Sequence, residues 1–146
     1  MQFTTLALSV LAAASAVSAG CIKCRSTGSI DSPYFVMSKN DETGYDLPAT
    51  LKWTDVQSNG TCSLVAKIEA NHPRLITDGP VTIEAWESKT KIGSFSYTKG
   101  EATNTVIGKF PCKSEFTFTF TPPASVSDAN LAFTELTNSG IFLKAC

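Results

Sequence analysis

The stretch from residue 114 to residue 121 reads Ser-Glu-Phe-Thr-Phe-Thr-Phe-Thr and decides the fold class of the chain. Successive side chains of a β-strand point to opposite faces, so the Phe side chains share one face and the Thr side chains share the other. Burying each Phe stabilises a fold by about 2 kcal/mol before conformational entropy is counted, which requires other strands to cover the aromatic face. The stretch therefore predicts a half-buried β-strand inside a sheet.

Other segments show the same alternation or lie between turn residues, and together they predict about nine short strands. Besides 114–121, the expected strands are 34–38, 50–56, 61–70, 81–88, 91–99, 104–110, 129–137 and 141–146. Segment 129–137 also fits a helical turn, but the turn residues that follow it favour a strand. Hairpins are expected between 50–56 and 61–70 and between 129–137 and 141–146, with 20–32, 39–48 and 72–80 as loops or tethers. The fold class is all-β: a single-domain antiparallel β-sandwich, with a β-barrel as the alternative.

The chain begins with an apolar run, residues 6–16, followed by the small-residue pattern Val17-Ser18-Ala19. This arrangement is typical of a cleaved secretory signal peptide, so we expect residues 1–19 to be a signal peptide and 20–146 to be one secreted, extracellular domain. A lipoprotein acylated on Cys21 is the competing interpretation. Ser18 stands where such a site requires Leu, and no Lys or Arg precedes the apolar run, so simple export is favoured.

The chain contains five cysteines, and export to an oxidising compartment makes disulfides their expected use. We expect a pair between Cys62 and Cys112 and a pair between Cys146 and either Cys21 or Cys24, because the ends of a domain often lie close together. The remaining thiol is either free or paired with a second molecule. A redox dithiol or half of a zinc site at the C-x-x-C of Cys21 and Cys24 is the alternative.

Charge and motifs argue against several classes of function. The chain has 12 basic and 13 acidic residues and no basic run, so neither nucleic acid nor a membrane surface is an expected partner. The single histidine, His72, is expected to be a solvated loop residue because no nucleophile motif accompanies it. Asp41, Glu42 and Asp46 offer a calcium site only if other loops contribute, and no cofactor or metal site is expected.

Catalysis by paired carboxylates remains the route to a hydrolase. Glu69, Glu84 and Glu87 fall on expected strands, but outward acids commonly solvate a sheet and no pair is singled out. No catalytic residue is therefore assigned, and the chain is expected not to be an enzyme.

Binding is better supported by the sequence. Trp86 falls beside Glu84 on the polar face of its expected strand, and Tyr45 lies in a polar loop. Such aromatic side chains suit a stacking platform for sugar rings or an anchor for a protein partner, unless Trp86 is covered. Phe142 is a further candidate of the same kind. Asn59-Gly60-Thr61 is an acceptor for N-glycosylation, expected at a hairpin tip.

The uncharged opening Met-Gln-Phe-Thr-Thr and the Ala/Ser-rich apolar run resemble the export signals of small secreted proteins of filamentous fungi. Together with the five cysteines, they make the chain similar to effector-type members of that group. The resemblance implies action outside the producing cell by binding host or cell-wall components, and it assigns no functional residue. The leading hypothesis is a non-enzymatic protein that recognises an extracellular or host protein. The alternatives are a module that binds cell-wall polysaccharide and, third, a small secreted hydrolase.

Overall fold

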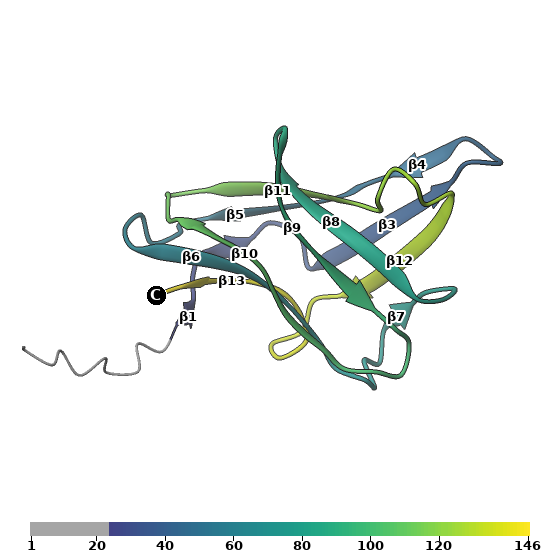
Figure 1. The fold of residues 1–146 in the computed structure, drawn as a ribbon. Helices are drawn as coiled ribbons and strands as arrows, with labels where there is room; N and C mark the ends of the chain where they lie inside the picture. Colours follow the sequence, from purple (N-terminus) through teal and green to yellow (C-terminus); the bar gives the residue numbers. More distant parts are fainter. Residues whose placement is uncertain (1–23) are drawn as a thin grey trace, which may run out of the picture.

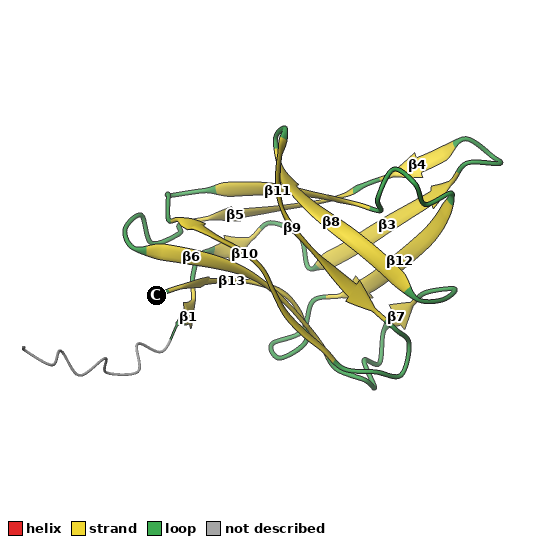
Figure 2. Cartoon of the chain, in the orientation of Figure 1, coloured by secondary structure: helices red, strands yellow, loops and turns green. Residues whose placement is uncertain are grey.

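A computed structural model describes residues 24–146, and strands and loops alone make up this part of the chain (Figure 2). Nine longer strands correspond to the segments expected from the alternation pattern, including the ambiguous segment that contains Leu131 and Phe133. Four strands of two or three residues add to them. The strands are β1 (Arg25–Ser26), β2 (Ser29–Ile30), β3 (Tyr34–Asn40), β4 (Tyr45–Leu47), β5 (Ala49–Thr54), β6 (Thr61–Ile68), β7 (Leu75–Ile76), β8 (Val81–Glu87), β9 (Thr90–Tyr97), β10 (Thr103–Pro111), β11 (Phe116–Thr121), β12 (Asp128–Thr134) and β13 (Gly140–Ala145).

The strands form three antiparallel sheets, which pack around a shared hydrophobic core (Figure 1). Sheet A has the order β1-β13-β6-β10, sheet B the order β2-β5-β11-β8-β9, and sheet C the order β4-β3-β12-β7. The all-β antiparallel fold is confirmed. Three sheets are present where a simple sandwich has two, and none of them closes into a barrel. Residues 24–146 contain no helix that is long and apolar enough to cross a membrane.

The Phe-rich strand β11 lies in the middle of sheet B and links all three sheets through ring contacts. Its three Phe side chains are at most 2% exposed. Phe118 packs against Phe110 of sheet A, with ring centroids 5.5 Å apart, and Phe120 packs edge-on against Phe35 of sheet C at 5.3 Å. Because aromatic rings bury large apolar areas, this strand is the centre of the core that the alternation predicted.

Two expected hairpins are wrong, although the strands themselves are present. β5 pairs with β11 and β2, whereas β6 pairs with β13 and β10, so the chain crosses from sheet B to sheet A between them. Likewise β12 belongs to sheet C and β13 to sheet A, and only an isolated bridge joins Leu136 to Ser139 between them. Short turns in sequence do not enforce pairing when each strand finds a better-packed partner elsewhere.

The short strands lie in segments that the sequence presented as loops. The expected tether contains β1 and β2, the expected polar loop contains the end of β3 and all of β4, and the loop after His72 contains β7. Each pairs with the edge of a longer strand, as Tyr45 does with Asn40. Backbone pairing forms these strands, and each is only two or three residues long, which is too short for an alternation pattern to appear in the sequence.

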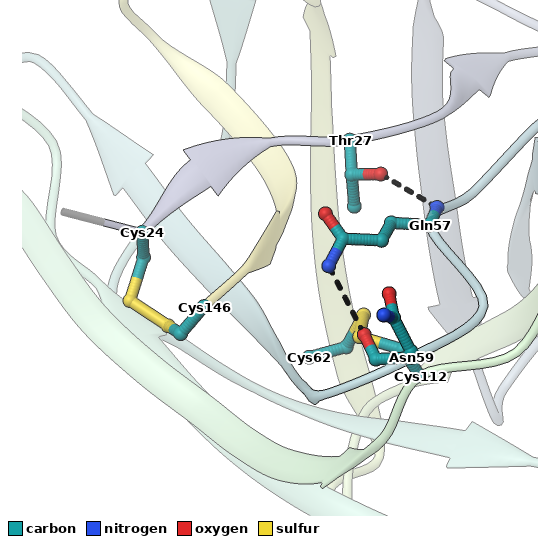
Figure 3. The surroundings of a disulfide bond; sticks show 7 residues. All are labelled: Cys24, Thr27, Gln57, Asn59, Cys62, Cys112 and Cys146. Carbon is teal, nitrogen blue, oxygen red and sulfur yellow. Dashed lines mark hydrogen bonds between the residues drawn. A yellow bond between two sulfur atoms is a disulfide. The ribbon is translucent and has the colours of Figure 1, made fainter. Parts of the chain in front are cut away.

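Both expected disulfides form, between Cys62 and Cys112 and between Cys24 and Cys146 (Figure 3). The second bond joins the segment before β1 to the end of the chain, which lies beside β1 in Figure 1. Of the two cysteines left open for Cys146, the structure therefore selects Cys24. The expected signal peptide, residues 1–19, and Cys21 lie outside the described residues. Two disulfides are consistent with a protein of an oxidising, extracellular compartment.

Candidate functional site

The outer face of sheet C is the most apolar exposed surface among the described residues. Side chains directly opposite each other on paired strands share a face. The register aligns Val36 with Ala132, and Ala132 with Ile76, across three neighbouring strands. Leu47 and Tyr45 of β4 lie opposite Ser38 and Asn40 of β3 and so extend the same face. We call this surface, made of Tyr34, Val36, Tyr45, Leu47, Ile76 and Ala132, the sheet C face.

Exposure distinguishes this face from the rest of the molecule. Six large apolar side chains of the described chain are exposed, and all but Val106 of β10 belong to the sheet C face. Ile76 is 69% exposed and Tyr34 is 61% exposed. Single exposed apolar residues are ordinary on a protein surface, but a contiguous group is typical of an interaction site.

The side chains that alternate with this face hold it in place. Phe35 and Phe133 stack with ring centroids 4.7 Å apart on the inner side of β3 and β12. Met37 and Leu131 form the next inward-facing pair, two residues further along β3 and β12, and are almost fully buried. Because the inner residues are packed into the core, the outer residues lie on a rigid sheet. A groove of about 440 Å³ runs over Tyr34, Val36 and Ile76.

The acids of this region gather near the end of the face that carries Asn40 and Tyr45. Asp128 lies opposite Asn40, and the Asp78 N–H donates to the Asn130 side chain at 2.8 Å. The exposed turn after β3 adds Asp41 and Glu42. At the other end, Arg74 lines the groove. The charge around the sheet C face is therefore mostly negative and concentrated at one end.

His72 is part of the scaffold of this face, and the expectation that it is a solvated loop residue is wrong. Its ring is buried and packs edge-on against Phe133, with centroids 5.8 Å apart. Nδ1 accepts the N–H of Arg74 at 3.2 Å, which leaves Nε2 to donate to the Thr134 carbonyl oxygen at 3.0 Å. The histidine thus ties the loop that leads to β7 onto β12.

The sequence-predicted binding residues separate into two places. Tyr45 belongs to the sheet C face and is 53% exposed. Trp86 and Glu84 instead line a depression of about 290 Å³ on the outer side of sheet B, together with Lys39 and Asp46 of the β3–β4 hairpin. Tyr45 and Asp46 are adjacent in β4, so their side chains point to opposite faces of this hairpin. A shared stacking platform of Trp86 and Tyr45 is therefore not formed.

The depression around Trp86 combines an aromatic ring with charged groups. Trp86 is half-buried opposite Thr119 on the hydroxylated face of β11, which is the polar face that its alternation predicted. Glu84 accepts a hydrogen bond from Lys91 at 2.7 Å, and Lys39 lies 3.5 Å from Asp41. Phe142, the weaker candidate, is also half-buried and lies in β13 on another part of the surface.

The acids considered for catalysis are engaged by other side chains. Glu69 accepts the Asn138 amide at 2.8 Å, and Glu87 pairs with Lys113. Within residues 24–146, no group of three or more His, Cys, Asp or Glu side chains is arranged to hold a metal ion.

Sequence reasoning missed Tyr34, Val36 and Ile76 as candidate binding residues. One signal was available: residues 34–37 read Tyr-Phe-Val-Met, an apolar run without alternation. Such a run is typical of a strand covered on both faces. In the structure, the core covers only the inner face of this strand. The outward apolar side chains of the run, Tyr34 and Val36, are therefore exposed.

A scan of protein-family models finds no match to this chain, and searches of curated proteins and of solved structures find none either.

Proposed function

We propose that the chain is exported and acts outside the cell by protein recognition, in an effector or host-surface role, through the sheet C face. The observation that carries this proposal is the concentration of exposed apolar side chains on one rigid sheet. A protein interface has an apolar, often aromatic centre and a polar rim, and this face has Val36 and Ile76 at its centre with acids beyond Tyr45. Tyr34 and Tyr45 supply amphipathic anchors of the type enriched at binding hot spots.

The charges around the sheet C face indicate which partner surface would be complementary to it. Asp78 and Asp128, with the acids of the β3–β4 turn, surround one end of the face. A complementary partner therefore has an apolar patch with Lys or Arg residues at one side. Complementary charges mainly accelerate encounter, so association is expected to slow as salt is raised.

The experiment compares three forms of the mature protein immobilised on beads: wild type, Val36→Ser/Ile76→Ser, and Val106→Ser. Val106 is the matched control, because it is an exposed strand valine (53%, against 46% for Val36) on a different sheet. Extracellular and cell-surface proteins are passed over the beads, retained proteins are identified by mass spectrometry, and each is purified and titrated against the three forms. The proposal expects a purified binder whose affinity falls at least tenfold for the double variant and is unchanged for the control.

Two results contradict the proposal. The first is a binder that the double variant retains as well as wild type does, since recognition would then lie elsewhere. The second is concentration-dependent dimerisation of wild type that the double variant abolishes, which would assign the face to a second copy of the chain.

A second candidate function is binding of cell-wall polysaccharide at the Trp86 depression. The half-buried indole next to Glu84, Asp46 and Thr121 combines a stacking surface with hydrogen-bonding groups, as sugar recognition requires. Wild type, Trp86→Ala and Tyr45→Ala are compared for retention on insoluble chitin, β-glucan and cellulose, after thermal melts verify that each is folded. Retention lost only in Trp86→Ala supports this candidate, and absence of retention by wild type rejects it.

A further inference from the structure

A separate cavity of about 260 Å³ lies between the edges of sheets A and B. Ile30 of β2 and Trp53 of β5 form one wall, and Ile141 and Leu143 of β13 form the opposite wall. Pro33 and Leu136 also line the cavity, and Ser26 is an exposed lining residue. The walls are therefore mostly apolar, and no residue of the sheet C face contributes to them.

Among residues 24–146, Glu135 is the only ionisable side chain that lines this cavity. Its carboxyl accepts the Ile141 N–H through both oxygens, at 2.8 and 3.1 Å. Gly140 makes room for it, because a Cβ at that position would overlap the carboxyl oxygens. Among the ion pairs of residues 24–146, none involves Glu135. A carboxyl thus faces an apolar cavity without a cation.

The turn at residues 136–139 does not by itself explain an acid at this place. A glutamine would accept the Ile141 N–H equally well and would avoid the cost of burying an ionisable group. Burial raises the pKa of Glu135 to about 8, while the Ile141 hydrogen bond opposes this rise. A cation inside the cavity would restore the ionised form by charge pairing, which is the strongest interaction available to this carboxyl.

We propose that this cavity binds a small organic amine, with the ammonium group against the Glu135 carboxylate and a compact apolar body against Trp53, Ile30 and Leu143. This site goes beyond the proposed protein recognition and does not depend on it. The apolar body gains from leaving water, and the ammonium group supplies the missing counter-charge. When the ammonium ion binds at pH 6.5, well below the pKa of Glu135, the carboxyl gives up its proton to solvent, so binding releases about one proton.

The test uses 2-phenylethylamine as the probe and 2-phenylethanol as its uncharged counterpart. The protein carries Trp86→Phe, which leaves Trp53 in the cavity wall as the single tryptophan and fluorescent reporter. The proposal expects saturable quenching or shift of Trp53 emission by the amine, at least tenfold weaker binding of the alcohol, and at least tenfold loss of amine affinity in Glu135→Gln. Affinity is also expected to rise about eightfold between pH 6.5 and pH 7.5, because the ionised fraction of Glu135 rises over this range.

Calorimetry in two buffers of different ionisation enthalpy measures the released proton at pH 6.5. Ser26→Phe, at an exposed position that lines the cavity, serves as a second variant that leaves Glu135 intact, adds no tryptophan and is expected to block entry. If Glu135→Gln does not fold, this variant and the proton release decide the question. Equal affinity for amine and alcohol, binding without proton release, or no change in Trp53 emission at millimolar amine overturns the proposal. None of these readouts involves the sheet C face, so a failure here leaves the proposed function standing.

Discussion

The Glu135 carboxyl receives the backbone N–H of Ile141 across the turn that leads from sheet C to sheet A. Burial raises the pKa of this carboxyl from its ordinary value of 4.5 to about 8. Between these two pH values the folded chain holds a proton that the unfolded chain has released. The stabilising contribution is therefore complete below pH 4.5 and is lost as pH rises to about 8. The expected slope is at most about 1.4 kcal/mol of unfolding free energy per pH unit.

Urea unfolding of wild type and Glu135→Gln between pH 4.5 and pH 8.5 measures this slope. The glutamine keeps an acceptor for Ile141 but does not titrate, so the variant gains stability relative to wild type as pH rises. Other groups titrate equally in both proteins and cancel in the difference. A difference that stays constant with pH would show that Glu135 is solvated.

Replacement of Gly93 by Ala is expected to destabilise the fold, because β9 and β10 approach closely there. A Cβ at Gly93 would overlap the Ile107 carbonyl oxygen, and Gly108 faces Ile92 at a similarly close approach. Overpacking of this kind costs about 1–3 kcal/mol. Gly79→Ala is the matched control, because nothing lies within 4 Å of the added Cβ. Thermal melts of the two variants check the prediction, which is wrong if both melt alike.

The bond between Cys62 and Cys112 is expected to contribute about 4 kcal/mol to the unfolding free energy in the chain-entropy model. It closes a loop with a sequence separation of 50 residues, and Cys62 is fully buried. Cys62→Ala/Cys112→Ala should therefore unfold at much lower urea than wild type under non-reducing conditions. Adding reductant to wild type should produce at least as large a loss, because it also opens the Cys24–Cys146 bond. An unchanged urea midpoint in the double variant would show that the bond adds nothing.

Asn59 lies in the exposed turn between β5 and β6, where Gln57 donates to its carbonyl oxygen at 3.2 Å. Expression in a secreting eukaryotic cell should therefore yield a glycan-bearing form whose mass falls on endoglycosidase treatment. Asn59→Gln should abolish this shift, whereas Thr61→Ser should retain it because serine also completes the acceptor motif. A mass shift that survives in Asn59→Gln would place the glycan elsewhere.

Several features of the fold follow directly from local pattern, and others do not. The burial of Phe118, Leu51 and Ile83 could be predicted from the alternation of residue types, because side chains of a strand alternate between two faces whatever strand it pairs with. The pairing partner of β5 could not be predicted from the sequence, because its actual partner, β11, lies more than fifty residues further along the chain than the adjacent β6. The same holds for β7 and β4, whose side chains are mostly exposed and whose strands exist through backbone hydrogen bonds.

The candidate sites divide in the same way. Tyr45, Glu84 and Trp86 could be chosen from residue type and position, but only folding placed Asp46 beside Trp86 and turned Tyr45 to the other side of the hairpin. Val36 was not selected from the sequence, because only the packing of the layers decides whether a strand face is covered. His72 looked solvated because its acceptor, the Thr134 carbonyl, is distant in sequence.

The sequence by itself determined an all-β chain and the inward faces of strands such as β5, β8 and β11, because these depend on local periodicity. It predicted the Cys62–Cys112 bond but left Cys21 and Cys24 open as partners of Cys146. The tertiary structure alone decided which strands pair, that the outer face of sheet C stays uncovered, and that Glu135 faces an apolar cavity. These depend on contacts between segments far apart in the chain, where packing and backbone pairing compete across the whole fold.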